Sequence, residues 1–143
     1  HGPGRQLLRC RRVDYRIEGY RAPRSRLTRE LRGRPLRLRN FQWLASSEAS
    51  LGTRLPVRRS GVVMVPVVTD DFPLHTGALE PDAWEEALVR EVERRPFSTL
   101  SLHDCYAHLW IDRYPRLLER LAERVTIRRV GDVVDELFRA EAL

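Results

Sequence analysis

Runs of apolar residues along the chain mark candidate strands. Val62–Val68 is a continuous β-branched run, the pattern of a strand buried on both faces of a parallel sheet. Phe97–Leu102 predicts a second buried strand, which ends at His103. Shorter apolar or alternating segments predict further strands at Val13–Tyr20, Leu36–Leu44 and Val125–Ile127.

Helical patterns lie between these strands. Asp82–Arg95 is the clearest helix, because acidic residues occupy its beginning, arginines its end, and Pro96 stops it. Trp84 is placed beside its apolar face. Other helices are predicted at Arg5–Arg12, Ser25–Arg32, Asp112–Glu123 and Asp132–Arg139, and loops at Ala45–Arg59 and Thr69–Pro81.

This alternation of strands and helices favours an α/β fold with parallel strands and outer helices. In such folds, functional groups gather at the carboxyl ends of the strands. Three polar clusters follow predicted strands: Arg21, the segment Thr69–Asp71, and the pair His103 and Asp104. The pattern predicts that a site forms where these ends meet, without specifying its chemistry.

The length of the chain fits one compact domain with a hydrophobic core. It has 143 residues, of which 42% are hydrophobic and 32% charged, a composition typical of globular proteins. The longest apolar run, Gly61–Val68, is far shorter than the ~20 residues that cross a bilayer, so we expect no membrane span. The chain begins with His1, so we expect its start to be cut or incomplete, and residues 1–4 could be an expression scar. The compartment stays open, with a slight preference for the cytoplasm.

Positive charge is concentrated in the first part of the chain. The net charge is +6, and residues 1–60 contain 16 Arg against four acidic residues. All 26 basic residues are Arg, which indicates a GC-rich coding sequence better than selection for phosphate contacts. They are scattered among Leu, Pro and Gly without a recognition helix or a stacking pair of aromatics. We therefore expect a solvated basic face and no nucleic-acid partner.

Five short segments in a set order carry a family resemblance, and the last of them is Val125–Leu137, near the end of the chain. Gly19–Arg24 contains an Arg-x-Pro motif, and Leu100–Asp104 is a strand end of the form Leu-x-His-Asp. Between them, Asn40–Ser47 has aromatics and a Ser pair, and Val62–Asp71 has an apolar run, a Pro and then acidic residues. In this order they resemble the C-terminal part of the polysaccharide deacetylase domain, a family of metal-dependent carbohydrate esterases. The resemblance implies one partial domain over residues 1–143, the C-terminal part of a distorted (β/α) barrel.

The resemblance also implies a function for several residues. The family is made of hydrolases that remove N-acetyl groups from amino sugars of a polysaccharide or its precursor, with water activated by zinc or another divalent metal. By position, His103 would protonate the departing amine and Arg21 would orient the catalytic carboxylate, roles that suit imidazole and guanidinium. Asp104 could orient His103 or cap the next segment. Candidates for binding the carbohydrate substrate are Asp104, Trp43 and Asp71.

Simpler interpretations exist for the same residues. His103 could be a strand-end histidine with a backbone partner, and Arg21 a solvated arginine. The loop containing Asp70, Asp71 and His75 fits solvation and helix entry better than metal binding. Cys105 is predicted to be a small buried filler rather than a nucleophile.

One departure from the family pattern limits the expected function. The Asp-Asp and His-x-x-x-His motifs that hold the metal do not precede Arg21 in this chain. We therefore expect no metal or other cofactor in this chain, no activity from it alone, and the missing motifs ahead of His1. The alternative is a non-catalytic carbohydrate-binding or interaction module derived from the same fold. A partial barrel exposes a sheet edge, so we also expect self-association.

Overall fold

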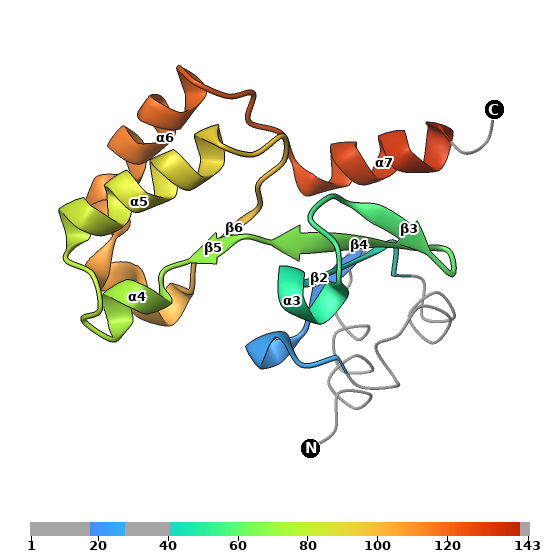
Figure 1. The fold of residues 1–143 in the computed structure, drawn as a ribbon, viewed down its shortest axis with the longest axis horizontal. Coiled ribbons are helices and arrows are strands. Elements are labelled where there is room, and N and C mark those ends of the chain that lie inside the picture. Colours follow the sequence, from blue (N-terminus) through green and yellow to red (C-terminus); the bar gives the residue numbers. More distant parts are fainter. Residues whose placement is uncertain (1–17, 28–40, 141–143) are drawn as a thin grey trace, which may run out of the picture. The chain divides into compact units, whose positions relative to one another are not determined.

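The computed structural model describes residues 18–27 and 41–140 (Figure 1). Contacts within the chain group it into two compact units, one formed by His1–Pro66 with Arg129–Leu143 and the other by Val67–Arg128. We name them the first and second unit and describe each by itself. The helix expected at residues 5–12 lies outside the described residues, as do most of the strand expected at 13–20 and parts of the elements expected at 25–32 and 36–44.

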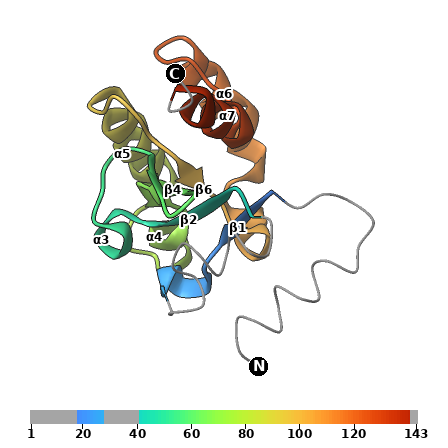
Figure 2. The same ribbon diagram turned by 90° about the vertical axis from the view of Figure 1, so that its right-hand side faces the viewer.

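The first unit is built around a mixed sheet. Its described strands lie in the order β1–β2–β4–β3, with bounds Gly19–Arg21, Trp43–Ser47, Val62–Val67 and Val57–Arg59. Figure 2 labels β1, β2 and β4 of this sheet. β1 and β2 are parallel, as expected, and every residue of β4 is buried, which confirms the strand predicted there. The described residues thus form an α/β structure with parallel strands and helices, but they contain no closed barrel, and a part of a barrel is not confirmed.

One strand pair departs from the expected parallel arrangement. β3 is antiparallel to β4, with Arg59 opposite Val62. The two residues between them, Ser60 and Gly61, both have positive φ angles, 51° and 77°. A two-residue turn with both residues in this region matches the twist of a hairpin and joins antiparallel neighbours.

The loop predicted at Ala45–Arg59 is confirmed only for residues 52–56 and is wrong on either side of them. β2 continues through Ser47, which caps the short helix α3 (Glu48–Leu51) by accepting a hydrogen bond from the Ser50 backbone N–H. Gly52 ends α3 with a φ of 65°, a left-handed conformation that glycine adopts without strain. The polar composition of the segment was a capping signal and not only a sign of solvation.

The first unit includes the last helix of the chain, α7 (Val130–Ala140), which confirms the helix predicted at the end. Val134 on α7 is fully buried, and the Arg58 guanidinium on β3 lies 4.5 Å from the centroid of the Phe138 ring. These contacts connect α7 to the edge strand β3.

The second unit combines a short parallel strand pair with helices. β5 (Thr69–Asp70) and β6 (Leu100–Ser101) pair in parallel. The helices α5 and α6 lie side by side (Figure 1) and bury an apolar core between them, which includes Trp84, Leu88, Leu117 and Leu121. The helical elements are α4 (Phe72–His75), α5 (Pro81–Glu93), the 3₁₀ segments η3 (Asp104–Leu109) and η4 (Ile111–Arg113), and α6 (Tyr114–Ala122).

The predictions for this unit are right in type and less accurate in extent. The helix expected at Asp82–Arg95 is confirmed as α5, although Glu80 occupies the N-cap position. The strand expected at Phe97–Leu102 is reduced to the two residues of β6, and the loop expected at Thr69–Pro81 contains β5 and α4. Val125–Ile127 forms no strand, so the strand predicted there is wrong. Among the residues described in both units, no helix combines the length and hydropathy that a membrane span requires.

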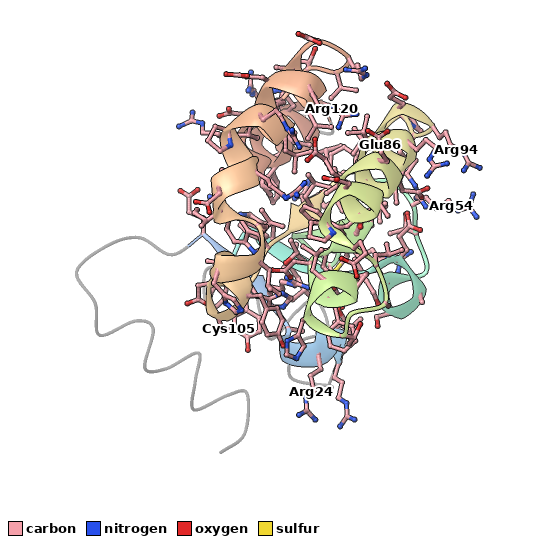
Figure 3. The ribbon with its side chains drawn as sticks, turned by 90° about the vertical axis from the view of Figure 1, so that its left-hand side faces the viewer. Arg24, Arg54, Glu86, Arg94, Cys105 and Arg120 are labelled. Atoms are coloured by element: carbon pink, nitrogen blue, oxygen red, sulfur yellow. The ribbon has the colours of Figure 1, made fainter. Side chains whose placement is uncertain are left out.

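A buried carboxylate links α5 to α6. Glu85 is only 1% exposed and accepts hydrogen bonds from Arg116 at 2.8 Å and from Arg120 at 2.5 Å. Arg120 also reaches Glu86 at 2.7 Å, and Figure 3 shows these two side chains between the helices. Burial raises the pKa of Glu85, but the hydrogen bonds from the two arginines outweigh it, so the pKa lies below its ordinary value.

Substituting Glu85→Gln should destabilise the second unit by about 1–3 kcal/mol at neutral pH, because two arginines lose a charged partner. The folded-state pKa is lowered, so the contribution is present above the ordinary value of 4.5 and is lost as the pH falls through the folded-state value. Urea unfolding at several pH values measures this, and the difference from wild type should shrink in acid. The control Glu86→Gln, at an exposed carboxylate, should change stability by about 0.5 kcal/mol or less.

Gly19→Ala should destabilise the first unit by about 1–3 kcal/mol. A Cβ at this position would lie 1.8 Å from an indole carbon of Trp43, its partner on β2, so the ring would have to move. The control Gly131→Ala adds a Cβ whose nearest neighbour is 3.9 Å away, in α7, and should be neutral or stabilising. Equal unfolding free energies for the two variants would contradict this packing.

Candidate functional site

Two of the predicted polar clusters meet at the carboxyl ends of β5 and β6. The strands pair with Asp70 opposite Ser101, so Asp71 and His103 follow them at neighbouring positions. The expectation that polar groups converge at these strand ends is confirmed for this pair. Asp71 and His103 form the centre of the candidate site, which lies entirely in the second unit.

The Asp71 carboxylate is fully buried and receives three N–H groups. Oδ1 lies 2.5 Å from Nδ1 of the His103 ring. Oδ2 accepts the His103 backbone N–H at 2.7 Å and the Trp110 indole N–H at 2.9 Å. Hydrogen bonds of this kind compensate a buried carboxylate for its removal from water.

Asp71 does not act as an ordinary helix cap. It occupies the N-cap position of α4, yet its side chain makes no capping hydrogen bond. The Asp71 backbone carbonyl accepts from Leu74 and His75, and the carboxylate of Asp70 accepts the Phe72 N–H. An N-cap carboxylate usually binds the first free N–H groups of its own helix. This one is turned toward His103 and Trp110 instead.

The hydrogen bond to Asp71 determines the protonation pattern of the His103 ring. A carboxylate can only accept, so Nδ1 carries the shared proton. Nε2 is then the ring nitrogen that does not face Asp71 and is left for another group. The His103 side chain is 37% exposed, whereas that of Asp71 is not exposed at all, so the histidine is the accessible member of the pair.

Aromatic rings flank the accessible histidine. The Tyr106 ring lies 5.3 Å from His103 between centroids and is stacked on His75 at 3.9 Å with an interplanar angle of 11°. Phe72, which is exposed, lies 5.9 Å from His75. Rings of this kind can pack against the apolar face of a sugar, and they are held in place by one another.

Asp104 and Cys105 follow the pair in the first turn of η3. The Asp104 carboxylate accepts the Cys105 backbone N–H in the first turn of η3, so it belongs to the local turn and has no bond to His103 among its described contacts. Asp71, and not Asp104, is the carboxylate that orients the histidine. Cys105 is exposed (Figure 3), so the prediction of a buried filler is wrong.

Arg21 and Trp43 belong to the first unit. Arg21 ends β1 opposite Ala45, and Trp43 lies half-buried on β2 with its indole over Gly19, where it packs against the neighbouring strand. The structure brings Asp71 and His103 together within one unit, while Arg21 and Trp43 are placed in the other.

The turn that follows Arg21 is held by serines. Arg24 and Ser25 both have φ angles of 53°, a region that costs side-chain-bearing residues about 1–2 kcal/mol. The Ser25 carbonyl accepts the hydroxyls of Ser46 and Ser50, and its own hydroxyl accepts the Ser47 N–H. Ser25 therefore does not begin a helix as predicted. Ser46 and Ser47, the Ser pair named in the resemblance, thus bind the residue that directly follows the Arg-x-Pro segment. Arg24 projects from this turn (Figure 3).

The metal that the resemblance implies has no ligand set in the described ranges. Within residues 18–27 and 41–140, His, Cys, Asp and Glu side chains form no group of three that could hold a metal ion. Asp71, the acidic residue nearest to His103, has both oxygens occupied by N–H donors. We assign no metal ligand to these residues.

The sequence does not predict a role for Trp110 at this site. Its indole N–H binds Asp71, and its ring contacts Tyr114 edge-on at 5.5 Å. A tryptophan seven residues after a histidine is no recognised sequence motif. The Trp110 indole reaches Asp71 only because η3 brings the chain back to this carboxylate.

Comparisons with family models, with curated proteins and with solved structures give no match to this chain. Its function is therefore argued from the site itself.

Asp71→Asn should change the tautomer ratio of the His103 ring. An amide cannot accept the same hydrogen bonds at both of its terminal atoms, so the fraction of the Nδ1-protonated tautomer should fall. ¹⁵N NMR of the histidine rings measures this fraction. The control Asp104→Asn, at a carboxylate outside the pair, should leave the His103 signals in place. A response to the control as large as that to Asp71→Asn would contradict the assignment.

Proposed function

We propose that this chain carries the proton-donating part of a polysaccharide deacetylase-like site, which hydrolyses N-acetyl groups of an amino sugar in a polysaccharide or precursor. The observation that carries the proposal is the pair formed by accessible His103 and buried Asp71. The pair includes the histidine of the Leu-x-His-Asp segment that resembles the family, and its geometry supports, independently of the resemblance, a proton-transfer role for His103.

The chemistry of amide cleavage explains why such a pair is needed. When water adds to the acetyl carbon and the C–N bond breaks, the bonding electrons go to nitrogen, and an amide anion is too basic to leave. Protonated His103 would deliver the Nε2 proton to that nitrogen, so that acetate and a free amine result. Asp71 would stabilise the imidazolium before transfer and hold the ring in one orientation throughout.

The ring cluster supports a sugar as the substrate. Tyr106 flanks the histidine with apolar ring surface and His75 is stacked on Tyr106, while the polar atoms of both rings can bind hydroxyl groups. The proposal includes Arg21 as the residue that orients a catalytic carboxylate. A divalent metal such as zinc would supply the activated water, but the described residues do not fit its site, so we derive no step through it.

A different function would use the same surface without catalysis. A carbohydrate-binding or interaction module would need the rings but no proton donor. The Asp71–His103 pair favours the hydrolase, because a binding surface gains little from a buried carboxylate that fixes one tautomer.

The test measures acetate release from an N-acetylated chitooligosaccharide by the full-length gene product containing this chain, with zinc or cobalt added. His103→Ala should lower kcat by about 10²–10⁴-fold, because the proton donor is lost. The matched control is His108→Ala, an exposed histidine on η3, which should keep the wild-type rate.

Two results would decide against the hydrolase. Unchanged acetate release by His103→Ala would remove this residue from the reaction. Absence of release by the metal-loaded wild-type protein, together with binding of the oligosaccharide that Tyr106→Ala abolishes, would instead support the binding module.

A further inference from the structure

Both ends of η3 reach the same carboxylate. His103 directly precedes η3 and binds Asp71 through its ring and its backbone N–H. Trp110 directly follows η3 and binds Oδ2 of Asp71 through its indole. Of the three donors to Asp71, the indole is therefore the one that does not belong to His103 itself.

We propose that Trp110 is a positioning residue of the candidate site, whose indole N–H fixes the rotation of the Asp71 carboxylate and thereby the orientation of the His103 ring. Only the expected effect on kcat depends on the proposed function. The orientation of the His103 ring by Asp71 and Trp110 is a property of the protein without substrate.

The torsional freedom of aspartate explains why a further donor matters. The terminal torsion of a carboxylate has a broad, two-fold profile, so the rotamer alone does not fix the plane of its oxygens. The His103 ring cannot supply a fixed reference, because it is the group to be oriented, and the His103 backbone N–H is one donor to Oδ2. A second donor to Oδ2, anchored outside His103, restricts the rotation of the carboxylate further. Trp110 is that donor, since it binds Oδ2 while Nδ1 lies at Oδ1.

The indole itself is well anchored. Trp110 packs against the apolar core of the second unit and meets Tyr114 edge-on. Its backbone N–H binds the Ala107 carbonyl, and its own carbonyl accepts the Arg113 N–H. These contacts hold the position of the N–H independently of His103.

The chain offers a matched control for removing an indole N–H. Trp84 donates its N–H to the backbone carbonyl of Asp70 at 3.0 Å and is buried in the same core. Trp110→Phe and Trp84→Phe each replace an indole by a ring without an N–H. The two lost hydrogen bonds lie at adjacent residues of one segment, and only that of Trp110 reaches the carboxylate.

The experiment measures the ratio of His103 ring tautomers by ¹⁵N NMR and needs no substrate. Trp110→Phe should lower the share of the Nδ1-protonated form relative to the Nε2-protonated form by about three- to ten-fold, the size expected for one hydrogen bond. Trp84→Phe should leave the ratio at the wild-type value even if it lowers stability. A wild-type ratio in folded Trp110→Phe, or an equal change in both variants, would overturn the proposal.

A double substitution tests the route of the effect. If Trp110 acts through Asp71, then Trp110→Phe combined with Asp71→Asn should give the tautomer ratio of Asp71→Asn alone. Additive effects would overturn the proposed route. If Trp110→Phe does not fold, the indole N–H signals of the wild type and of Asp71→Asn replace it. The Trp110 signal should then move more than that of Trp84, and an unmoved Trp110 signal would count against the proposal.

Catalysis provides a second readout that separates this inference from the proposed function. In the acetate assay, Trp110→Phe should lower kcat by about 5- to 50-fold with KM unchanged, as expected when a group acts only on the transition state. Loss of the tautomer preference without any acetate release in the wild type would support Trp110 as a positioning residue and refute the hydrolase. A wild-type tautomer ratio together with a lowered kcat in Trp110→Phe would refute the positioning role of Trp110. It would not bear against the hydrolase.

Discussion

The buried carboxylate of Asp71 is the constraint on which the second unit depends at its candidate site. A charge that is fully removed from water must be compensated by donors, and here three N–H groups from two residues of one segment supply them. Meeting that demand determines the path of η3, the side on which His103 is exposed, and the tautomer of its ring. The same carboxylate is no longer available as a helix cap, and the Asp70 carboxylate accepts the Phe72 N–H at the start of α4 instead.

The two units show different ways of holding polar groups. In the first unit, serine hydroxyls stabilise a turn with two consecutive positive φ angles, and the strain is offset by neutral hydrogen bonds. In the second unit, the acceptors are carboxylates. Glu85 binds two arginines and so joins α5 to α6, and Asp71 binds Trp110 at the end of η3. Charge-assisted bonds are the stronger kind, and they occur where a carboxylate has been buried.

Local pattern was sufficient to predict the strongly periodic elements and the two strand ends where Asp71 and His103 meet. The run at Val62–Val68 and the helix after Pro81 were recognisable because burial on both faces, and amphipathic spacing, leave a direct trace in composition. The hairpin at Ser60 and Gly61 was missed because its turn lacks the common Asn-Gly or Asp-Gly pair. The partner of His103 was also not recognised, because the choice between Asp71 and Asp104 depends on the register of β5 against β6. Trp110 was missed for the same reason, since tertiary path and not spacing brings it to Asp71.

The attachment of η3 at both ends has a consequence for how this segment can change in evolution. A six-residue 3₁₀ helix is long for its kind, and its hydrogen-bond geometry gives it little stability of its own. Because residues 103 and 110 both bind one carboxylate, inserting or deleting a residue between them would rotate one side chain out of reach. The exposed positions Asp104, Cys105 and His108 carry no such restriction. The spacing of this segment is therefore under tighter constraint than its composition, so that related chains should vary here by substitution and not by length.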